Sequence, residues 1–363
     1  YMNTYKKIVK RIENFNPSIY AKTRNFVDGG ISKLSPYISR GVISTNEVSK
    51  ILLNIGYKKY QLEKFFQELA WRDYWQKKWQ LVQNIDIDLK NEQKPVFSYK
   101  NPKAITNGNT SISAINKAVS ELYSTGYMHN HLRMYTASIC CNVGKYHWLN
   151  NAKWMYYHLI DGDWGSNALS WQWVAGTNSH KKYYANQNNI NKYCHTNDKK
   201  TFLDYSYEVL TEKNEVPNEL LDEIEIDLKT KLPEKKSPKL NPLLPTIIYT
   251  TYNLDANWLA DINANRVLLL EPKHFEKYPV SEKVLNFILE LSKDVTNIQV
   301  LAMDFDELYE KIDKQTEIIF KEHPFCNHFK GNKVEREWLF PGLEATGSFF
   351  NYWNKGLKKH KIL

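Results

Sequence analysis

The spacing of apolar residues changes once along this chain, and that change limits the folds it can adopt. From about residue 5 to residue 200, apolar side chains recur every three or four residues, which is typical of packed helices. After residue 242, short β-branched runs alternate with helical stretches. This order predicts an all-helical domain followed by a smaller α/β domain with a mostly parallel sheet. We expect the helical domain at 1–200, a charged, proline-containing linker or arm at 201–242, and the α/β domain at 243–363.

Local signals place individual elements within this frame. Ser44 followed by Glu47 predicts a capping box, and Gly56 predicts the end of the same helix. A helix is expected to close the chain over 343–360. The other expected helices are 58–84, 111–126, 129–144, 150–163, 281–294 and 304–312. The four expected strands are 244–254, 265–272, 297–304 and 316–323.

Composition narrows the functional classes. No run of 18 apolar residues occurs and the start lacks a secretory apolar region, so a cytoplasmic protein without a membrane span is expected. The four cysteines form no CxxC pair. The segment HPFCNH (323–328) could offer metal ligands, but no second ligand cluster is spaced to complete a site, and we interpret it as a loop. No metal site is predicted, and no obligate protein partner is evident.

Charge is distributed unevenly. Residues 1–200 carry 28 Lys and Arg against 13 Asp and Glu, a net +15, and residues 201–363 carry 21 against 27, a net −6. A basic, tryptophan-rich half favours a polyanionic partner. General solubility would also explain the charge, so charge alone does not decide between the two.

Four segments of the helical half hold polar groups that a plain bundle does not need. GGISKLSPYISRG (29–41) could cradle phosphates or could be an ordinary loop and helix cap. In FFQELAWRDYW (65–75), Glu68 and Arg72 have the spacing of a common surface ion pair. TGYMHNHLRMY (125–135) and LIDGDWGSNALSWQWVAG (159–176) place amides, charges and aromatic rings together, as in a pocket wall.

Taken together in this order, the four segments resemble the flavin-binding domain of the DNA photolyase and cryptochrome family. The segments TGxMHNxLRM and LIDGDxxxNxxxWQW carry most of the resemblance, which covers about residues 15–195. It implies a bound FAD, catalytically in the reduced form FADH−. The residues that the resemblance assigns to the cofactor are Tyr20, Ser32, Lys33, Leu34, Ser35, Phe65, Arg72, Asn130, Arg133, Asp161, Asp163 and Asn167.

Within that set, Ser32 to Ser35 and Arg72 are expected at the phosphates, and Arg133 is expected to pair with Asp161 beside the flavin ring. Asn167 is expected to face flavin N5, where an amide can accept a hydrogen bond. The resemblance assigns a cyclobutane pyrimidine dimer in UV-damaged DNA to a second set: Glu68, Trp71, Asn130, Met134 and Trp173. Such a dimer is easily flipped out of DNA, and Trp71 and Trp173 could stack on it.

The resemblance also implies light-driven repair by electron transfer, with Glu68 stabilising the reduced dimer. Trp171 and Trp148 match the proximal and middle members of the family's tryptophan chain. The distal position, near residue 95, holds no tryptophan; Phe97 and Tyr99 lie nearby in sequence. Ile31 and Lys33 also differ from the usual residues of the phosphate loop.

The order of domains resembles a bacterial subgroup of inverted topology, with the flavin domain first. That resemblance implies a preference for single-stranded DNA, a C-terminal domain that covers the flavin, and no antenna pigment. Two alternatives remain open: a cryptochrome-like blue-light photoreceptor, and a single-strand DNA-binding module with a structural flavin. The presence of Glu68, Trp71, Met134 and Trp173 favours a deoxyribodipyrimidine photolyase.

Overall fold

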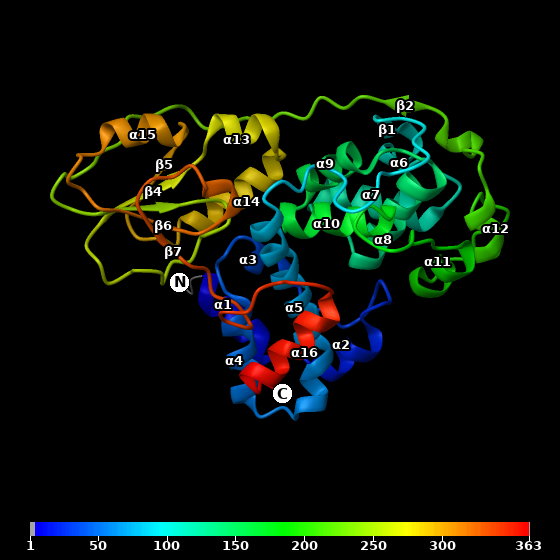
Figure 1. Cartoon of the computed structure of the whole chain (residues 1–363), viewed down its shortest axis with the longest axis horizontal. Coiled ribbons are helices and arrows are strands. Elements are labelled where there is room, and N and C mark those ends of the chain that lie inside the picture. The colour runs from blue at the N-terminus through cyan, green and yellow to red at the C-terminus, as the bar shows by residue number, and fades with distance from the viewer. Residues whose placement is uncertain (1–3, 363) are drawn as a thin grey trace. The chain divides into compact units, whose positions relative to one another are not determined.

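The structure is a computed structural model that describes residues 4–362 (Figure 1). Internal contacts divide the chain into two compact units. The helical unit comprises Lys22–Ile31 and Asn84–Leu228. The sheet unit combines the segment through Ala21 with Ser32–Gln83 and the chain from Lys229 onward. The two units therefore alternate along the sequence. The expected division into a flavin domain, a linker and an α/β domain, with boundaries at residues 200 and 242, stays a prediction.

The helical unit is built from helices that pack around α8, α9 and α10. Its core contains three fully buried tryptophans, Trp148, Trp154 and Trp164. A short antiparallel pair, β1 with β2, joins the start and the end of the unit. The elements are β1 (Asn101–Pro102), α6 (Lys103–Thr106), α7 (Ser113–Thr125), α8 (Asn130–Ser138), the π-helix η1 (Ile139–Val143), α9 (Trp148–His158), α10 (Trp164–Ala175), α11 (Gln187–Cys194), α12 (Tyr207–Glu212), η2 (Asn218–Leu220) and β2 (Glu223–Ile224).

The sheet unit contains five parallel strands in the order β5-β4-β3-β6-β7, together with helices from both ends of the chain. Its elements are α1 (Thr4–Glu13), α3 (Ser35–Ser39), α4 (Thr45–Ile55), α5 (Lys59–Val82), β3 (Thr246–Tyr249), β4 (Asn265–Leu269), α13 (Pro272–Lys277), α14 (Glu282–Ser292), β5 (Ile298–Leu301), α15 (Phe305–Lys311), β6 (Ile318–Lys321), η3 (Pro324–Cys326), β7 (Asn332–Val334) and α16 (Phe349–His360). Helix α2 (Pro17–Thr23) runs across the boundary between the units.

The predicted fold class is confirmed, because a helical part is followed in sequence by strands that form a parallel sheet. The capping box of α4 is confirmed: Ser44 Oγ accepts a hydrogen bond from Glu47 N at 3.1 Å, and Glu47 Oε2 accepts one from Ser44 N at 3.0 Å. The closing helix α16 begins at Phe349, later than expected, because the Ser348 side chain caps it. Strand β7 was not expected, because its three residues are polar or half-buried and show no clear alternation.

The carboxyl ends of β3 and β6 meet where the strand order reverses, which is the usual ligand crevice of an open parallel sheet. Here aromatic rings fill that position. The Tyr252 ring stacks on His323 with centroids 4.4 Å apart, and Trp79 of α5 packs edge-on against His323 and Phe325 at 5.2 Å and 4.7 Å. The backbone of Leu254 also donates a hydrogen bond to Arg40 O at 2.9 Å. This edge of the sheet therefore contacts helix α5 and the end of α3.

Candidate functional site

A partly buried ion pair of the helical unit joins α8 to the turn before α10. Arg133 Nη2 lies 2.9 Å from Asp161 Oδ2, and Arg133 Nε donates to Met128 O at 2.7 Å. The Arg133 guanidinium also lies over the Tyr127 ring, 5.5 Å from its centroid. Asp161 is only 6 % exposed, so the pair fixes a charged group inside the unit. The structure thus brings together the two residues that were expected to pair.

Asp163 starts helix α10. Its side chain accepts a hydrogen bond from Ser166 N at 2.7 Å, which satisfies one of the free N–H groups of the first turn. Gly162 is required beside it, because a Cβ there would lie 2.8 Å from Leu159 O and 3.1 Å from Tyr156 O. The segment LIDGD (159–163) therefore forms a tight, polar turn that leads into the N-terminus of α10. Its two carboxylates have different roles, one in an ion pair and one in a cap.

Asn167 lies one turn into α10 and is 9 % exposed. Its amide nitrogen donates to Ala152 O of α9 at 2.8 Å, so the orientation of the amide is fixed. The amide oxygen remains as a hydrogen-bond acceptor. A ligand that presents an N–H group to this position would be recognised by that oxygen.

The remaining predicted residues of the helical unit differ in exposure. Trp148 and Trp171 are buried, at 0 % and 2 % exposed, whereas Trp173 is 37 % exposed and packs against Tyr183 with centroids 5.8 Å apart. Asn130, the first residue of α8, is exposed, and Met134 is half-buried. Of the three tryptophans expected to take part in electron transfer or substrate binding, two are therefore enclosed by the unit and one lies at its surface.

The histidines beside Asn130 are uncharged at neutral pH. Burial lowers the pKa of His131 to about 4 and also lowers the pKa of His129. His129 Nδ1 accepts a hydrogen bond from His131 N at 3.2 Å and caps α8. The cluster seen in the sequence is therefore in part a helix cap.

The predicted phosphate residues lie in the sheet unit, at the entry to the five-residue helix α3. Lys33 adopts a left-handed backbone conformation, with φ 53°, and its carbonyl accepts a hydrogen bond from Arg11 Nη1 at 3.1 Å. Leu34 is buried, and its N–H lies 3.4 Å from Ser32 Oγ. Arg72 Nη2 donates to Ile38 O at 3.2 Å, which ties α5 to the end of α3.

The predicted residues on α5 lie among other side chains of the sheet unit. Phe65 is buried and packs against Phe15 and Tyr20, with centroids 4.6 Å and 5.1 Å away. Glu68 Oε1 lies 3.9 Å from Lys64 Nζ. One face of the Trp71 indole is covered by the Phe349 ring of α16, at a centroid distance of 3.6 Å and an angle of 8° between planes. A base that stacked on Trp71 would use the other face or displace Phe349.

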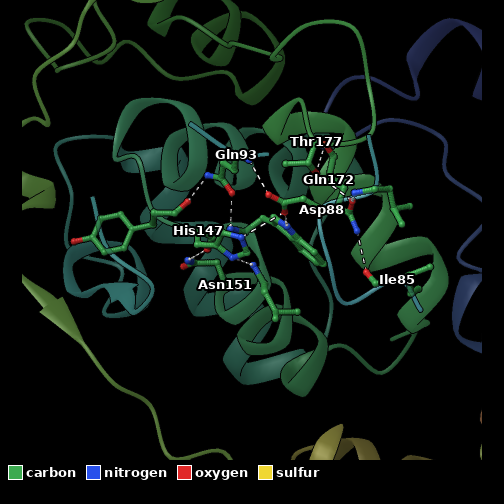
Figure 2. A network of polar contacts seen from close by, with 11 residues as sticks. Ile85, Asp88, Gln93, His147, Asn151, Gln172 and Thr177 are labelled. Carbon is green, nitrogen blue, oxygen red and sulfur yellow. Dashed lines mark hydrogen bonds and ion pairs between the residues drawn. The ribbon is translucent and has the colours of Figure 1, made fainter. Parts of the chain in front are cut away.

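Several polar groups of these units were missed at the level of the sequence. Asp88 accepts a hydrogen bond from Trp148 Nε1 at 2.7 Å, and Asp86 accepts one from Trp164 Nε1 at 2.8 Å. Figure 2 shows Asp88 within a wider network that also contains Gln93, His147 and Gln172. The only sequence signal is the alternation of acidic and apolar residues in NIDIDLK (84–90), which does not identify the partner indoles.

The segment HPFCNH belongs to the aromatic core of the sheet unit. His328 Nε2 lies 2.9 Å from Glu271 Oε1, and burial raises the pKa of the Cys326 thiol. Within residues 4–362, His, Cys, Asp and Glu side chains form no group of three that could hold a metal ion. No helix in that same range combines the length and the apolar character needed to cross a membrane.

Comparisons with known proteins match about half of this chain. Residues 65–250, just over half of the chain, match the family model for the FAD binding domain of DNA photolyase. The deoxyribodipyrimidine photo-lyase of Alkalihalophilus pseudofirmus is 30% identical over 181 residues, which are 46% of this chain and 36% of the relative. The mitochondrial deoxyribodipyrimidine photo-lyase of Saccharomyces cerevisiae is 30% identical over 191 residues, 47% of this chain and 33% of the relative.

Among solved structures, a bacterial class III photolyase from Agrobacterium tumefaciens is 25% identical and matches with a TM-score of 0.47. That match covers 52% of this chain and 42% of the other. The chain spans about a third of the length of the curated relatives it matches.

Proposed function

Since this chain belongs to the family of the FAD binding domain of DNA photolyase, we propose that it binds FAD and repairs cyclobutane pyrimidine dimers in DNA under blue light. The observation that carries the proposal is the polar entry to α10. There the carboxylate of a partly buried ion pair, a helix cap and a fixed amide follow one another within seven residues, Asp161 to Asn167. A plain helical bundle gains nothing from burying these groups together.

The donor set at this position fits a flavin. Ala152 O holds the Asn167 amide, and the Asp161 carboxylate holds the Arg133 guanidinium. Neither side chain therefore has to reorganise when it binds a ring that carries N–H and carbonyl groups. Reduced FAD, when bound, supplies an electron to the substrate after it absorbs light. The other residues proposed to hold the cofactor are Tyr20, Ser32, Lys33, Leu34, Ser35, Phe65, Arg72, Asn130 and Asp163.

We propose that the substrate is bound by Glu68, Trp71, Asn130, Met134 and Trp173. The two indoles would stack on the flipped dimer, each contributing about 1–3 kcal/mol. Glu68 would hydrogen-bond the dimer and stabilise its negatively charged form. The excess of basic residues in the first 200 positions supports a DNA partner, and the preference for single strands is part of the proposal. The aromatic filling between β3 and β6 supports a sheet that holds helices rather than an antenna pigment.

The direct test uses FAD-loaded, photoreduced protein and an oligothymidine that carries cyclobutane dimers. We expect recovery of thymine absorbance under blue light and none in the dark, with faster recovery on single strands than on duplex. Photoreducible flavin without any recovery would contradict repair and favour a blue-light photoreceptor. Failure to bind FAD at all would contradict the whole proposal.

The role of Glu68 can be tested separately from cofactor binding. Glu68→Gln removes the negative charge and should lower repair per absorbed photon about tenfold, the value of one charge-assisted hydrogen bond. FAD content should not change. Glu63→Gln, at an exposed position of the same helix, is the matched control and should repair normally. Equal repair by Glu68→Gln and its control would remove Glu68 from the substrate site.

A further inference from the structure

The loop that follows α5 places a carboxylate on the indole of Trp148. Asp88 Oδ1 accepts a hydrogen bond from Trp148 Nε1 at 2.7 Å and lies 3.4 Å from His147 Nε2. Asp88 Oδ2 accepts a hydrogen bond from Gln93 N at 2.7 Å. Asp88 and His147 lie side by side in Figure 2. Both oxygens of this carboxylate are therefore engaged, and the indole that it contacts is fully buried.

The loop is held on both sides, so the position of Asp88 is defined by the fold. Gln93 Oε1 accepts a hydrogen bond from Trp148 N at 3.0 Å, and Gln93 Nε2 donates to Tyr146 O at 2.8 Å. On the other side, Gln172 Nε2 donates to Ile85 O at 2.9 Å. Gln93 and Gln172 are buried, and the loop is thereby fixed against the start of α9 and the end of α10 (Figure 2).

From Trp148 a series of rings leads to the surface. The His147 and Trp148 rings have centroids 5.9 Å apart, and the Tyr99 ring stacks on His147 at 5.0 Å with 28° between planes. Tyr99 is 65% exposed. His147 Nδ1 accepts a hydrogen bond from Leu149 N at 3.3 Å, which places the ring proton on Nε2, facing Asp88. Burial lowers the pKa of His147, although Asp88 opposes this effect, and the neutral ring fits this arrangement.

Phe97 and Tyr99, the two aromatic residues near the expected distal position, differ in their contacts and in their chemistry. Phe97 packs edge-on against Tyr146, at a centroid distance of 5.7 Å, and carries no group that can release a proton. A phenol that loses an electron also loses its proton readily, and an exposed phenol can pass that proton to water. Tyr99 combines the phenol, the exposure and the ring contact toward Trp148.

We propose that Tyr99 is the terminal electron donor of the path that runs through Trp171 and Trp148, and that Asp88 accepts the indole proton of Trp148 during transfer. The proposal rests on the proposed function, because its one-electron oxidant is a light-excited oxidised flavin. When bound, that flavin would take one electron from Trp171, and Trp148 would give one electron to Trp171. The oxidised indole of Trp148, a far stronger acid than the neutral one, passes its Nε1 proton to Asp88.

Tyr99 then gives one electron to Trp148, which takes its proton back from Asp88. The phenolic proton of Tyr99 goes to water. The net change is one electron moved from Tyr99 to the flavin and one proton released to solvent. A thiol in solution restores the phenol by donating a hydrogen atom, which the exposure of Tyr99 permits.

The test follows radicals by time-resolved absorbance after a blue flash on protein loaded with oxidised FAD. In the parent protein we expect a tyrosyl signal to replace the tryptophanyl signal. Tyr99→Phe should abolish the tyrosyl signal and lower photoreduction in the presence of thiol about tenfold or more. Tyr207→Phe, at an exposed tyrosine of α12, is the matched control and should behave as the parent. An undiminished tyrosyl signal in Tyr99→Phe would overturn the assignment while leaving FAD binding intact.

The role of Asp88 is tested in protein without flavin. The Trp148 indole N–H is identified by comparing ¹⁵N-labelled parent with Trp148→Phe, and we expect Asp88→Asn to move that resonance upfield, because an amide is a weaker acceptor than a carboxylate. An unchanged resonance would overturn the contact. In the FAD-loaded protein, Asp88→Asn should leave oxidised Trp148 in its protonated form for longer. Failure of FAD to bind would contradict the proposed function, whereas the indole measurement stands independently of it.

Discussion

Asp73 on α5 is a carboxyl group enclosed by the sheet unit. It is 3% exposed, and its Oδ2 accepts hydrogen bonds from Thr45 Oγ1 at 2.8 Å and from Leu339 N at 2.7 Å. Burial raises its pKa to about 6, although both hydrogen bonds act in the opposite direction. The ionised form of Asp73 is thus destabilised by burial, on the helix that also carries Trp71 and Arg72.

The raised pKa predicts how stability depends on pH. The folded state binds the Asp73 proton more tightly than the unfolded chain, so the contribution to the free energy of unfolding is greatest below about pH 4 and falls as pH rises through about 6. The total loss is about 3 kcal/mol. Asp73→Asn keeps an acceptor oxygen but cannot ionise, so the difference in urea stability between variant and parent should grow in favour of the variant between pH 4 and pH 7. A constant difference over that range would contradict the buried, titrating carboxyl.

A substitution at Asn167 tests its position near the flavin through the absorbance spectrum of the cofactor itself. Asn167→Asp should change the absorbance spectrum that accumulates under blue light, because a carboxylate near flavin N5 favours a different protonation of the ring than an amide does. The substitution also replaces the N–H donor to Ala152 O by a carboxylate oxygen, so the spectra are compared only after the FAD content of variant and parent has been matched. Identical spectra in variant and parent, at equal FAD content, would contradict the placement of Asn167 at N5.

Among the elements, α4 shows which boundaries a sequence can define. Its capping box and its glycine end follow from local chemistry, and both are present. The carboxylate on Trp148, by contrast, comes from a loop 60 residues earlier, and the ring on Trp71 comes from α16. Which carboxylate meets which indole depends on tertiary packing, and apolar spacing does not encode it. Motifs therefore predict which residues belong to the candidate site, whereas the neighbours of those residues are given only by the structure.

Two glycines that flank α4 give a matched pair of tests. Both have positive φ, 65° at Gly41 and 95° at Gly56, so alanine is strained at either position by about 1–2 kcal/mol. At Gly41 a Cβ would also lie 2.3 Å from Tyr252 O, whereas at Gly56 nothing lies within 4 Å. Gly41→Ala should therefore lower the free energy of unfolding by a further 1–3 kcal/mol or so, measured by urea denaturation. Equal losses for the two variants would contradict the close contact between this loop and the segment after β3.

For the whole molecule, the change of apolar period predicted the two kinds of architecture correctly. It did not predict that residues 32–83 would belong to the same compact unit as the sheet. Contacts such as Leu254 N to Arg40 O and Tyr74 Oη to Gly347 O join segments more than 200 residues apart. Periodicity reports the local conformation of a segment but carries no information about such distant partners.

The charge of the whole chain predicts a salt effect on DNA binding. If the first 200 residues, with net +15, neutralise three phosphates of a single strand, affinity should fall about twentyfold between 50 and 200 mM salt. Fluorescence anisotropy of labelled oligothymidine in the dark measures this directly. Affinity that does not respond to salt would exclude an electrostatic contribution from this half of the chain.

The interleaving of the two units has a consequence for the order in which the chain can fold during synthesis. Most of the helical unit is one continuous stretch, Asn84–Leu228, which leaves the ribosome before any strand of the large sheet. Helix α5 leaves earlier still, but its partners Leu339, Gly347 and Phe349 are made more than 260 residues later. The aromatic face of α5 therefore stays without these partners while more than 260 further residues are translated. Nascent chains halted before α16 should be the form most dependent on chaperones.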